Sequence, residues 1–217
     1  MIVAAHQTMM GPQGAPPPYA KEVQYLVFDG TQCVETAAPS NAMKLRIVYN
    51  GHAISGVEAN VLGLWSNTTS PAQRVYVGPY FTNARCVLVA SEYNVARTAT
   101  NVYAEQIVDI PGALHTFVKS GTTYTKSIGN FGTFTNPNPI GIGGRNEYNL
   151  EGVHYCNEEY MFVGNVYIFE RWDSGVQTAK YIPVVDLNGV ACFYDEISGA
   201  LHYPWTGNPL VAGPDKT

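Results

Sequence analysis

Aromatic rings beside amide or guanidinium groups occur in three turn-rich stretches, and these residue types suit sugar recognition. Flat rings pack on the CH faces of a sugar, while amides and guanidinium groups make paired hydrogen bonds to polar ligands. The candidate ligand-binding residues are Trp65, Asn67, Arg145, Asn146, Tyr148 and Trp205. The sequence therefore predicts a glycan-binding surface at these stretches. The alternative is that each ring only covers one end of the fold.

Catalytic carboxylates would have to flank one scissile bond, and the spacing of Asp and Glu in the sequence does not predict such a pair. Acids at alternate positions of a strand would face one groove, as a glycosidase requires. No Glu-x-Asp-x-Glu run occurs, and the nearest groupings are Glu170 with Asp173 and the acids Glu147, Glu151, Glu158 and Glu159, which we expect in solvated loops. A G-x-S-x-G elbow for a nucleophilic serine is also missing from the sequence. We assign no catalytic residue and expect a protein that is not an enzyme.

Metal-ligating residue types are present but poorly arranged. His154 and Cys156 alternate along the chain and would share one face of a strand, with Glu158 two residues further on. Three ligands on one strand would need a bend and a fourth partner, so a transition-metal site is disfavoured. The four cysteines, at positions 33, 86, 156 and 192, contain no C-x-x-C pair. We expect buried free thiols, with the redox state left open.

Length and charge exclude several classes of protein. The 217 residues suffice for one β-sandwich but not for a second full domain. The formal net charge is −5 and Lys and Arg form no cluster, so nucleic acid is not an expected partner. The first residues carry no basic group, and His6, Gln7 and Thr8 interrupt their short apolar stretch. We expect neither a signal peptide nor membrane insertion.

Most of the chain is expected to form short β-strands that end at turn residues. The clearest hairpin joins residues 115–119 and 122–126 through Ser120 and Gly121, and Val163–Phe169 is expected to be a central strand covered on both faces. The expected strands are Val23–Asp29, Met43–Tyr49, Ala59–Trp65, Arg74–Gly78, Cys86–Ala90, Asn101–Ile110, Leu114–Ser120, Thr122–Ser127, Ile140–Gly143, Met161–Trp172, Val190–Tyr194 and Leu201–Tyr203.

These runs favour an all-β fold, a two-sheet antiparallel jelly-roll β-sandwich over residues 23–217. Residues 1–22 differ, because they contain a Pro/Gly tract from Gly11 to Tyr19 that cannot enter a sheet. We expect this segment to be an extended N-terminal arm.

The last third of the chain carries the most specific pattern. It runs through Gly164–Trp172, Tyr181–Val185, Gly189–Tyr203 and Val211–Pro214. With Tyr25–Gln32 and His115–Val118 upstream, the chain resembles LamG-like domains of the concanavalin A-like lectin/glucanase superfamily. The resemblance spans about Val23 to Pro214 and implies the same sandwich. Domains of this kind are frequent in phage structural proteins and in surface proteins of gut bacteria.

Two segments depart from the family pattern. The opening turn continues with Cys33–Ala37 in place of an aromatic residue and a Thr-Gly step. The usual glycine-rich close is replaced by Pro204–Pro209, which places Trp205 in a turn.

The resemblance also implies that calcium is the most plausible ion, since such domains often bind it at the rim of the sandwich. Asp109, Glu147 and Asp173 would be its candidate ligands. The sequence has no Asp-rich calcium loop, so no cofactor is assigned and the metal ligands stay unknown.

The resemblance and the missing secretion signal together imply a non-catalytic recognition or assembly module on a virion surface, such as a phage decoration, fibre or tail protein. Its expected partners are glycans, other virion or surface proteins through the N-terminal arm, and further copies of the chain. The alternative is a secreted or surface lectin-like domain of a bacterium, and a glycoside hydrolase ranks last. The expected location is the virion surface or the extracellular space.

Overall fold

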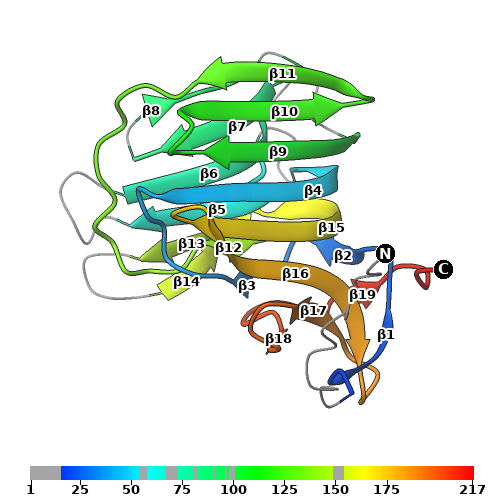
Figure 1. Ribbon diagram of the computed structural model, residues 1–217. Helices are drawn as coiled ribbons and strands as arrows, with labels where there is room; N and C mark the ends of the chain where they lie inside the picture. Colours follow the sequence, from blue (N-terminus) through cyan, green and yellow to red (C-terminus); the bar gives the residue numbers. More distant parts are fainter. Residues whose placement is uncertain are drawn as a thin grey trace, which may run out of the picture.

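The computed structural model describes residues 16–53, 58–66, 73–80, 83–89, 91–95, 97, 101–148 and 154–217. These residues form two β-sheets that pack face to face, as Figure 1 shows. Apart from the short 3-10 helix η1 (Glu158–Tyr160), the described residues contain no helix. The prediction of an all-β sandwich is confirmed.

The larger sheet forms the front layer in Figure 1 and follows the order β11-β10-β9-β4-β15-β16-β17-β18. Three further strands join it, because β1 pairs with β16, β2 with β15 and β19 with β2, all antiparallel. The bounds are β1 Tyr19–Glu22, β2 Leu26–Asp29, β4 Met43–Ala53, β9 Tyr103–Asp109, β10 Leu114–Lys119, β11 Thr122–Ser127, β15 Phe162–Asp173, β16 Val176–Asp186, β17 Ala191–Asp195, β18 Leu201–His202 and β19 Val211–Ala212.

The second sheet lies behind the first and follows the order β14-β13-β5-β6-β7-β8, with β12 and β3 attached beside β5. The pair β5–β13 is parallel, and the other pairs are antiparallel. The bounds are β3 Val34–Glu35, β5 Leu62–Ser66, β6 Gln73–Tyr80, β7 Asn83–Leu88, β8 Ser91–Glu92, β12 Gly141–Ile142, β13 Arg145–Tyr148 and β14 His154–Asn157.

The core lies between the sheets and is built from alternate residues of each strand. In β4, the side chains of Met43, Leu45, Ile47 and Tyr49 are buried, while Lys44 between the first two is not. This alternation is the period of two that a strand with one buried face requires. The two sheets therefore share one continuous hydrophobic core.

The predicted hairpin is present, with β10 and β11 paired from Leu114–Ser127 to Lys119–Thr122. Its two turn residues, Ser120 and Gly121, both have positive φ, at 49° and 76°. Two such residues make the tight turn whose twist matches that of the flanking strands.

The strand β15 occupies the predicted central position, between β4 on one side and β16 and β2 on the other. The expectation that both of its faces are covered is wrong, because Val163, Tyr167 and Ile168 are only partly buried. On this outer face Tyr167 packs edge-on against Tyr25 and Tyr103, with ring centroids 5.3 and 4.9 Å apart. Tyrosines rather than a third layer of structure cover it.

The sheet begins at Tyr19, four residues before the boundary expected at Val23. Residues Tyr19–Glu22, which were expected in the arm, pair with β16. They lie after the prolines, and prolines could not pair in this way because they have no N–H to donate to a ladder. The neighbouring strand β16 contains Pro183 at the point where its pairing changes from β15 to β1. There the Val23 amide donates to the Pro183 carbonyl, at 3.1 Å. This hydrogen bond uses only the carbonyl of Pro183, which has no N–H.

A buried polar chain crosses the core at His115, whose side chain is fully enclosed. Its Nδ1 lies 2.6 Å from the Tyr93 carbonyl oxygen, and its Nε2 lies 3.0 Å from the side-chain amide of Gln106. That amide is in turn bonded to the Tyr49 hydroxyl, at 2.5 Å. Burial lowers the pKa of His115 from 6.5 to about 4, so the ring is neutral at pH 7.

The lowered pKa of His115 predicts a loss of stability in acid. The unfolded chain binds a proton below pH 6.5, whereas the folded chain does so only near pH 4, so stability falls as the pH drops through this window. The loss attributable to His115 should reach about 3 kcal/mol. Urea unfolding at pH 7 and pH 4.5 measures it, and His115→Gln should show a clearly smaller difference between the two pH values. An equal difference in both proteins would contradict this assignment.

Candidate functional site

Two turns that are far apart in the sequence dock against each other at one end of the sandwich. The Asn208 amide donates to the Thr31 hydroxyl, and the Asn208 side-chain amide donates to Asp29, both at 3.0 Å. Next to them the Trp205 amide donates to the Cys33 carbonyl, at 3.0 Å. Gly207 has a φ of +84°, and a Cβ there would lie 2.0 Å from the Thr31 carbonyl oxygen. Only glycine allows this close approach.

Asn146 joins this junction to the second sheet. The side chain of Asn146 is fully buried, and its Oδ1 accepts hydrogen bonds from the Trp205 indole N–H (3.2 Å) and the Cys33 thiol (3.0 Å). Its Nδ2 donates to the carboxylate of Glu35 (3.4 Å) and to the Pro139 carbonyl (3.3 Å). An amide with two donors and two acceptor positions can satisfy all four partners.

Three rings stack beside Asn146 in the order Tyr148, His154, Trp205. Their centroids are 4.3 and 4.0 Å apart, and the interplanar angles are 8° and 26°. The Tyr148 hydroxyl donates to Glu35 Oε1 at 3.3 Å, and His154 Nε2 lies 3.2 Å from the same oxygen. Burial lowers the pKa of His154 and the Glu35 charge opposes this shift, so the ring is neutral at pH 7. The Trp205 indole is thus held at its N–H and on one face.

A cavity of about 360 Å³ opens beside Trp205. It is lined by Gly30, Thr31, Cys156, Glu158, Met161, Thr206 and Gly207. Cavities of this size accommodate small ligands. Trp205 directly precedes the lining residue Thr206 but does not itself line the cavity, and it is 38% exposed.

Arg145 lies on the opposite face of β13 from Asn146 and Tyr148. The stretch was expected to be a loop, but it forms a strand, and successive side chains of a strand point to opposite faces. The Arg145 guanidinium is ion-paired with Glu147 and lies over the Tyr160 ring, 3.4 Å from its centroid. Glu147 also accepts from the Tyr155 hydroxyl (2.5 Å) and the Asn157 amide (2.7 Å). Arg145 is therefore not part of the cluster around Asn146.

The structure separates the six candidate binding residues. Asn146, Tyr148 and Trp205 come together, whereas Arg145 does not join them. Trp65 lies on β5 opposite Glu147, next to Arg145 rather than Asn146. Asn67 lies outside the described residues.

Sequence reasoning missed Glu35, and it did not connect His154 with Trp205. Glu35 follows the opening turn, in the first of the two segments that depart from the family pattern, and Trp205 lies in the second. The only hint of this contact in the sequence was that both segments differ from the LamG-like pattern that the rest of the chain resembles. Their contact depends on strand pairing between residues about 170 positions apart in the sequence.

The carboxylates considered for catalysis or calcium are held by protein donors. Asp173 accepts from Arg171, Ser40 and Thr178, and its pKa is lowered to about 2, chiefly by the hydrogen bonds from Arg171. Asp109 accepts from the Gly112 amide, and Glu147 is buried rather than solvated as expected. The oxygen atoms of Asp173 and Glu147 are engaged by protein donors and do not fit a calcium site, since its ligands must direct free oxygen atoms at the ion.

The remaining acids that the structure describes lie in different places. Glu170 binds Arg46 and Gln177, Glu158 and Glu159 begin helix η1, and Glu151 lies outside the described residues. Among the residues that the structure describes, no three His, Cys, Asp or Glu side chains are grouped so that they could hold a metal ion. The four cysteines are free thiols; Cys33, Cys86 and Cys192 are buried as expected, whereas Cys156 is only partly buried.

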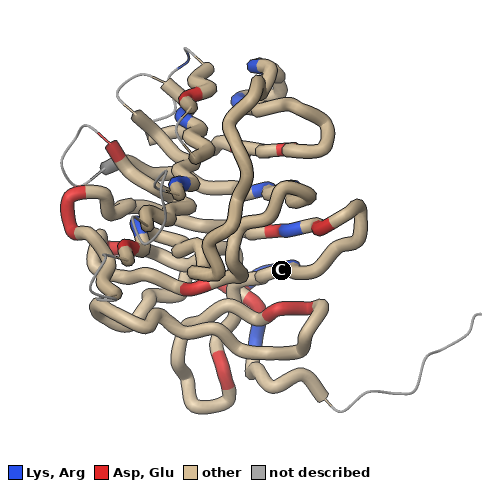
Figure 2. Tube along the Cα trace, turned by 90° about the vertical axis from the view of Figure 1, so that its left-hand side faces the viewer, with Lys and Arg blue, Asp and Glu red and all other residues tan. Residues whose placement is uncertain are grey.

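The described residues form a β-sandwich with a cavity at the junction of the two turns, close in sequence to Trp205. A comparison of the chain with models of known protein families gave no match, and a search of curated proteins gave none. In the described part of the chain no helix has the length and apolar character needed to cross a membrane. Acidic and basic residues are interspersed along the tube in Figure 2, in keeping with the absence of Lys or Arg clusters in the sequence.

Because the ion pair Arg145–Glu147 is buried, we expect the isosteric change Glu147→Gln to lower the free energy of unfolding strongly. Glu147 is 3% exposed, so Glu147→Gln would leave the Arg145 charge buried without its counterion. We expect a loss of about 3 kcal/mol in the free energy of unfolding.

The matched control is Glu105→Gln, because Glu105 pairs with Arg46 on a more exposed surface and Arg46 keeps Glu170. That change should cost less than about 1 kcal/mol. Urea unfolding at pH 7 compares the two variants, and equal losses would show that the Arg145–Glu147 pair has no special weight.

Proposed function

We propose that this chain is a non-catalytic recognition module that binds glycans in the cavity beside Trp205. The observation that carries the proposal is a partly exposed indole, fixed by Asn146 and His154, next to a cavity with hydroxyl and carboxylate groups. A sugar would place its CH face on the ring and its hydroxyls against Thr206 and Glu158. Because the ring is already held, little conformational freedom is lost on binding.

The wider assignment rests on the resemblance. We propose a LamG-like, concanavalin A-like domain with jelly-roll topology and an N-terminal arm, acting on the surface of a phage virion as a decoration, fibre or tail protein. Weak binding at single sites is sufficient there, because many copies on one particle bind a surface together. A lectin-like domain on a bacterial surface is the second candidate, since the same site would serve it.

Trp205→Ala should weaken glycan binding at least about fivefold, because it removes the stacking surface. The measurement is a glycan array probed with the protein displayed multivalently, with calcium and again with EDTA. We expect the same signals in EDTA, because the candidate calcium ligands are engaged by protein donors. Trp205→Phe should retain part of the signal.

The matched control is Tyr103→Ala, which removes an aromatic side chain that is 59% exposed on the outer face of the larger sheet. It should leave the array signals unchanged. Unfolding midpoints of all variants show whether the sandwich still folds. A blank array for the folded wild-type protein would contradict glycan binding and leave contacts with other proteins of the particle.

Deletion of residues 1–15 tests the proposed docking role of the arm. The deletion removes no described strand, since β1 begins at Tyr19. The truncated protein should keep its unfolding midpoint and its glycan binding but lose incorporation into particles, as measured by their protein content. Normal incorporation would rule out the arm as the docking element.

A further inference from the structure

A second cavity lies on the larger sheet, at the end of β15 remote from Trp205. Its volume is about 370 Å³, and it is lined by Ala42, Lys44, Asp109, Pro111, Trp172 and Gly175. None of these residues touches the cluster around Asn146. The size falls within the range of small-ligand sites.

The cavity is built on a row of residues that are direct neighbours across four strands. Asp109 of β9 pairs with Lys44 of β4, Lys44 pairs with Trp172 of β15, and Trp172 pairs with Gln177 of β16. Neighbouring side chains in such a row lie on one face of the sheet. Asp109, Lys44 and Trp172 line the cavity, so the row presents an acceptor, a donor and an aromatic ring side by side on a rigid support. The Gln177 amide at its end donates to Glu170.

The charged groups of Asp109 and Lys44 in this row are oriented, and both keep hydrogen-bonding capacity for a ligand. The Asp109 carboxylate is positioned by the Gly112 amide, which donates to its Oδ1 at 2.8 Å. Its Oδ2 lies 3.7 Å from the Lys44 ammonium, and the two side chains are 30% and 41% exposed. The Lys44 ammonium also lies 5.6 Å from the centroid of the Trp172 ring. A loose, half-exposed ion pair of this kind contributes little by itself and can exchange its bonds for those of a ligand.

The chemistry of the row selects the class of ligand. The charges of Lys44 and Asp109 cancel, so neither an anion nor a cation gains from binding there. A donor and an acceptor a few ångströms apart match two neighbouring hydroxyls, since each hydroxyl both donates and accepts. The adjacent indole suits the CH face of a ring.

We propose that this cavity binds one neutral pyranose ring, stacked on Trp172 with its hydroxyls bonded to Lys44 and Asp109, so that the chain is bivalent for glycans. The inference rests on the proposed function, which it extends to a second site.

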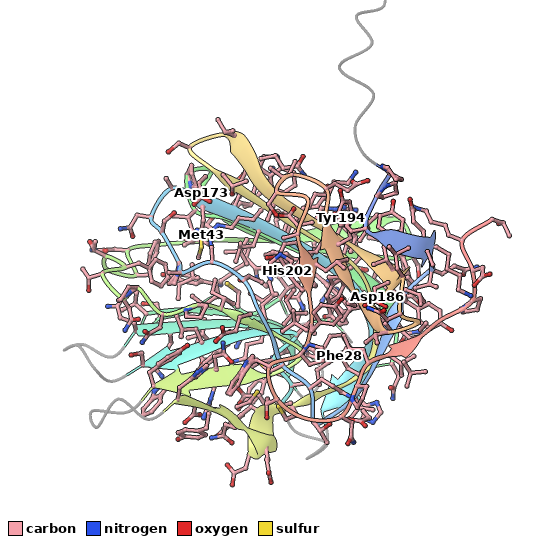
Figure 3. The ribbon with its side chains drawn as sticks, turned by 90° about the horizontal axis from the view of Figure 1, so that it is seen from below. Phe28, Met43, Asp173, Asp186, Tyr194 and His202 are labelled. Atoms are coloured by element: carbon pink, nitrogen blue, oxygen red, sulfur yellow. The ribbon has the colours of Figure 1, made fainter. Side chains whose placement is uncertain are left out.

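The two sites are well separated. Trp172 lies next to Asp173 and pairs with Lys44, while the start of β15 pairs with Phe28 and Asp29, beside the junction that holds Trp205. Figure 3 shows Met43 and Asp173 together on one side of the molecule and Phe28 on the other. The nine residue steps from Val163 to Trp172 span about 30 Å. One sugar ring cannot reach both sites, so each must bind a separate residue of a glycan or a separate chain.

The three tryptophans of the sequence allow both sites to be followed in one experiment. Two-dimensional 1H–15N NMR of the full chain resolves the indole N–H groups of Trp65, Trp172 and Trp205, and single Trp→Phe variants assign them. The probes are the methyl glycosides of glucose, galactose, mannose and N-acetylglucosamine, titrated one at a time. Trp65 serves as the internal control.

We expect at least one glycoside to shift the Trp172 signal in a saturable way. Lys44→Ala and Asp109→Asn should each raise the dissociation constant for that shift about fivefold to tenfold. Lys126→Ala, which removes an exposed lysine on β11, should leave it unchanged. The dispersion of the backbone signals shows whether each variant is folded.

The remaining outcomes show which of the two sites, if either, binds sugar. If only Trp205 responds, the proposed function stands and the second site does not exist. If only Trp172 responds, the second site stands and the cavity beside Trp205 is not a sugar site. If neither responds to any of the four glycosides, both are overturned.

Discussion

The antiparallel ladder between β4 and β15 is the constraint on which the other elements depend. It runs from Phe162 opposite Ala53 to Asp173 opposite Met43, and it joins segments more than one hundred residues apart. The same β15 strand carries β2 near its start and β16 near its end. The positions of β1, β19 and the C-terminal hairpins follow from the pairing of β16 and β2 with this strand. Its formation closes a long loop, so its entropy cost must be met by the core that it completes.

Hydrogen bonds of buried polar groups fix how the second sheet and the core pack against the larger sheet. Asn146 has four partners on three segments, and His115 connects two strands of the larger sheet to the Tyr93 carbonyl. A buried polar group without a partner costs about 1–3 kcal/mol, so these side chains penalise any shift in register. Arg145 and Glu147 do the same on the outer face of β13. Specificity of packing at this end of the sandwich therefore comes from polar contacts as well as from apolar burial.

The two proposed sites use the frame in different ways. Trp205 belongs to a turn and owes its position to Asn146, His154 and the opening turn, whereas Trp172 belongs to β15 itself. A site on paired strands needs little further support, while a site on a turn needs the hydrogen bonds that hold it. Because the sites lie at opposite ends of β15, a glycan-coated surface would meet the molecule at two points. On a particle with many copies, this arrangement would add to avidity without stronger single contacts.

The sequence by itself determined the all-β class, the hairpin at Ser120 and Gly121, and the central place of β15. These depend on local patterns, namely alternation, turn residues and runs of apolar side chains.

Only the tertiary structure decided which candidate residues share a site. Arg145 and Asn146 are adjacent in the sequence but face opposite sides of β13, while Cys33 and Trp205 are far apart and in contact. Local patterns do not contain the register between distant strands, because that register is set by the packing of the whole core.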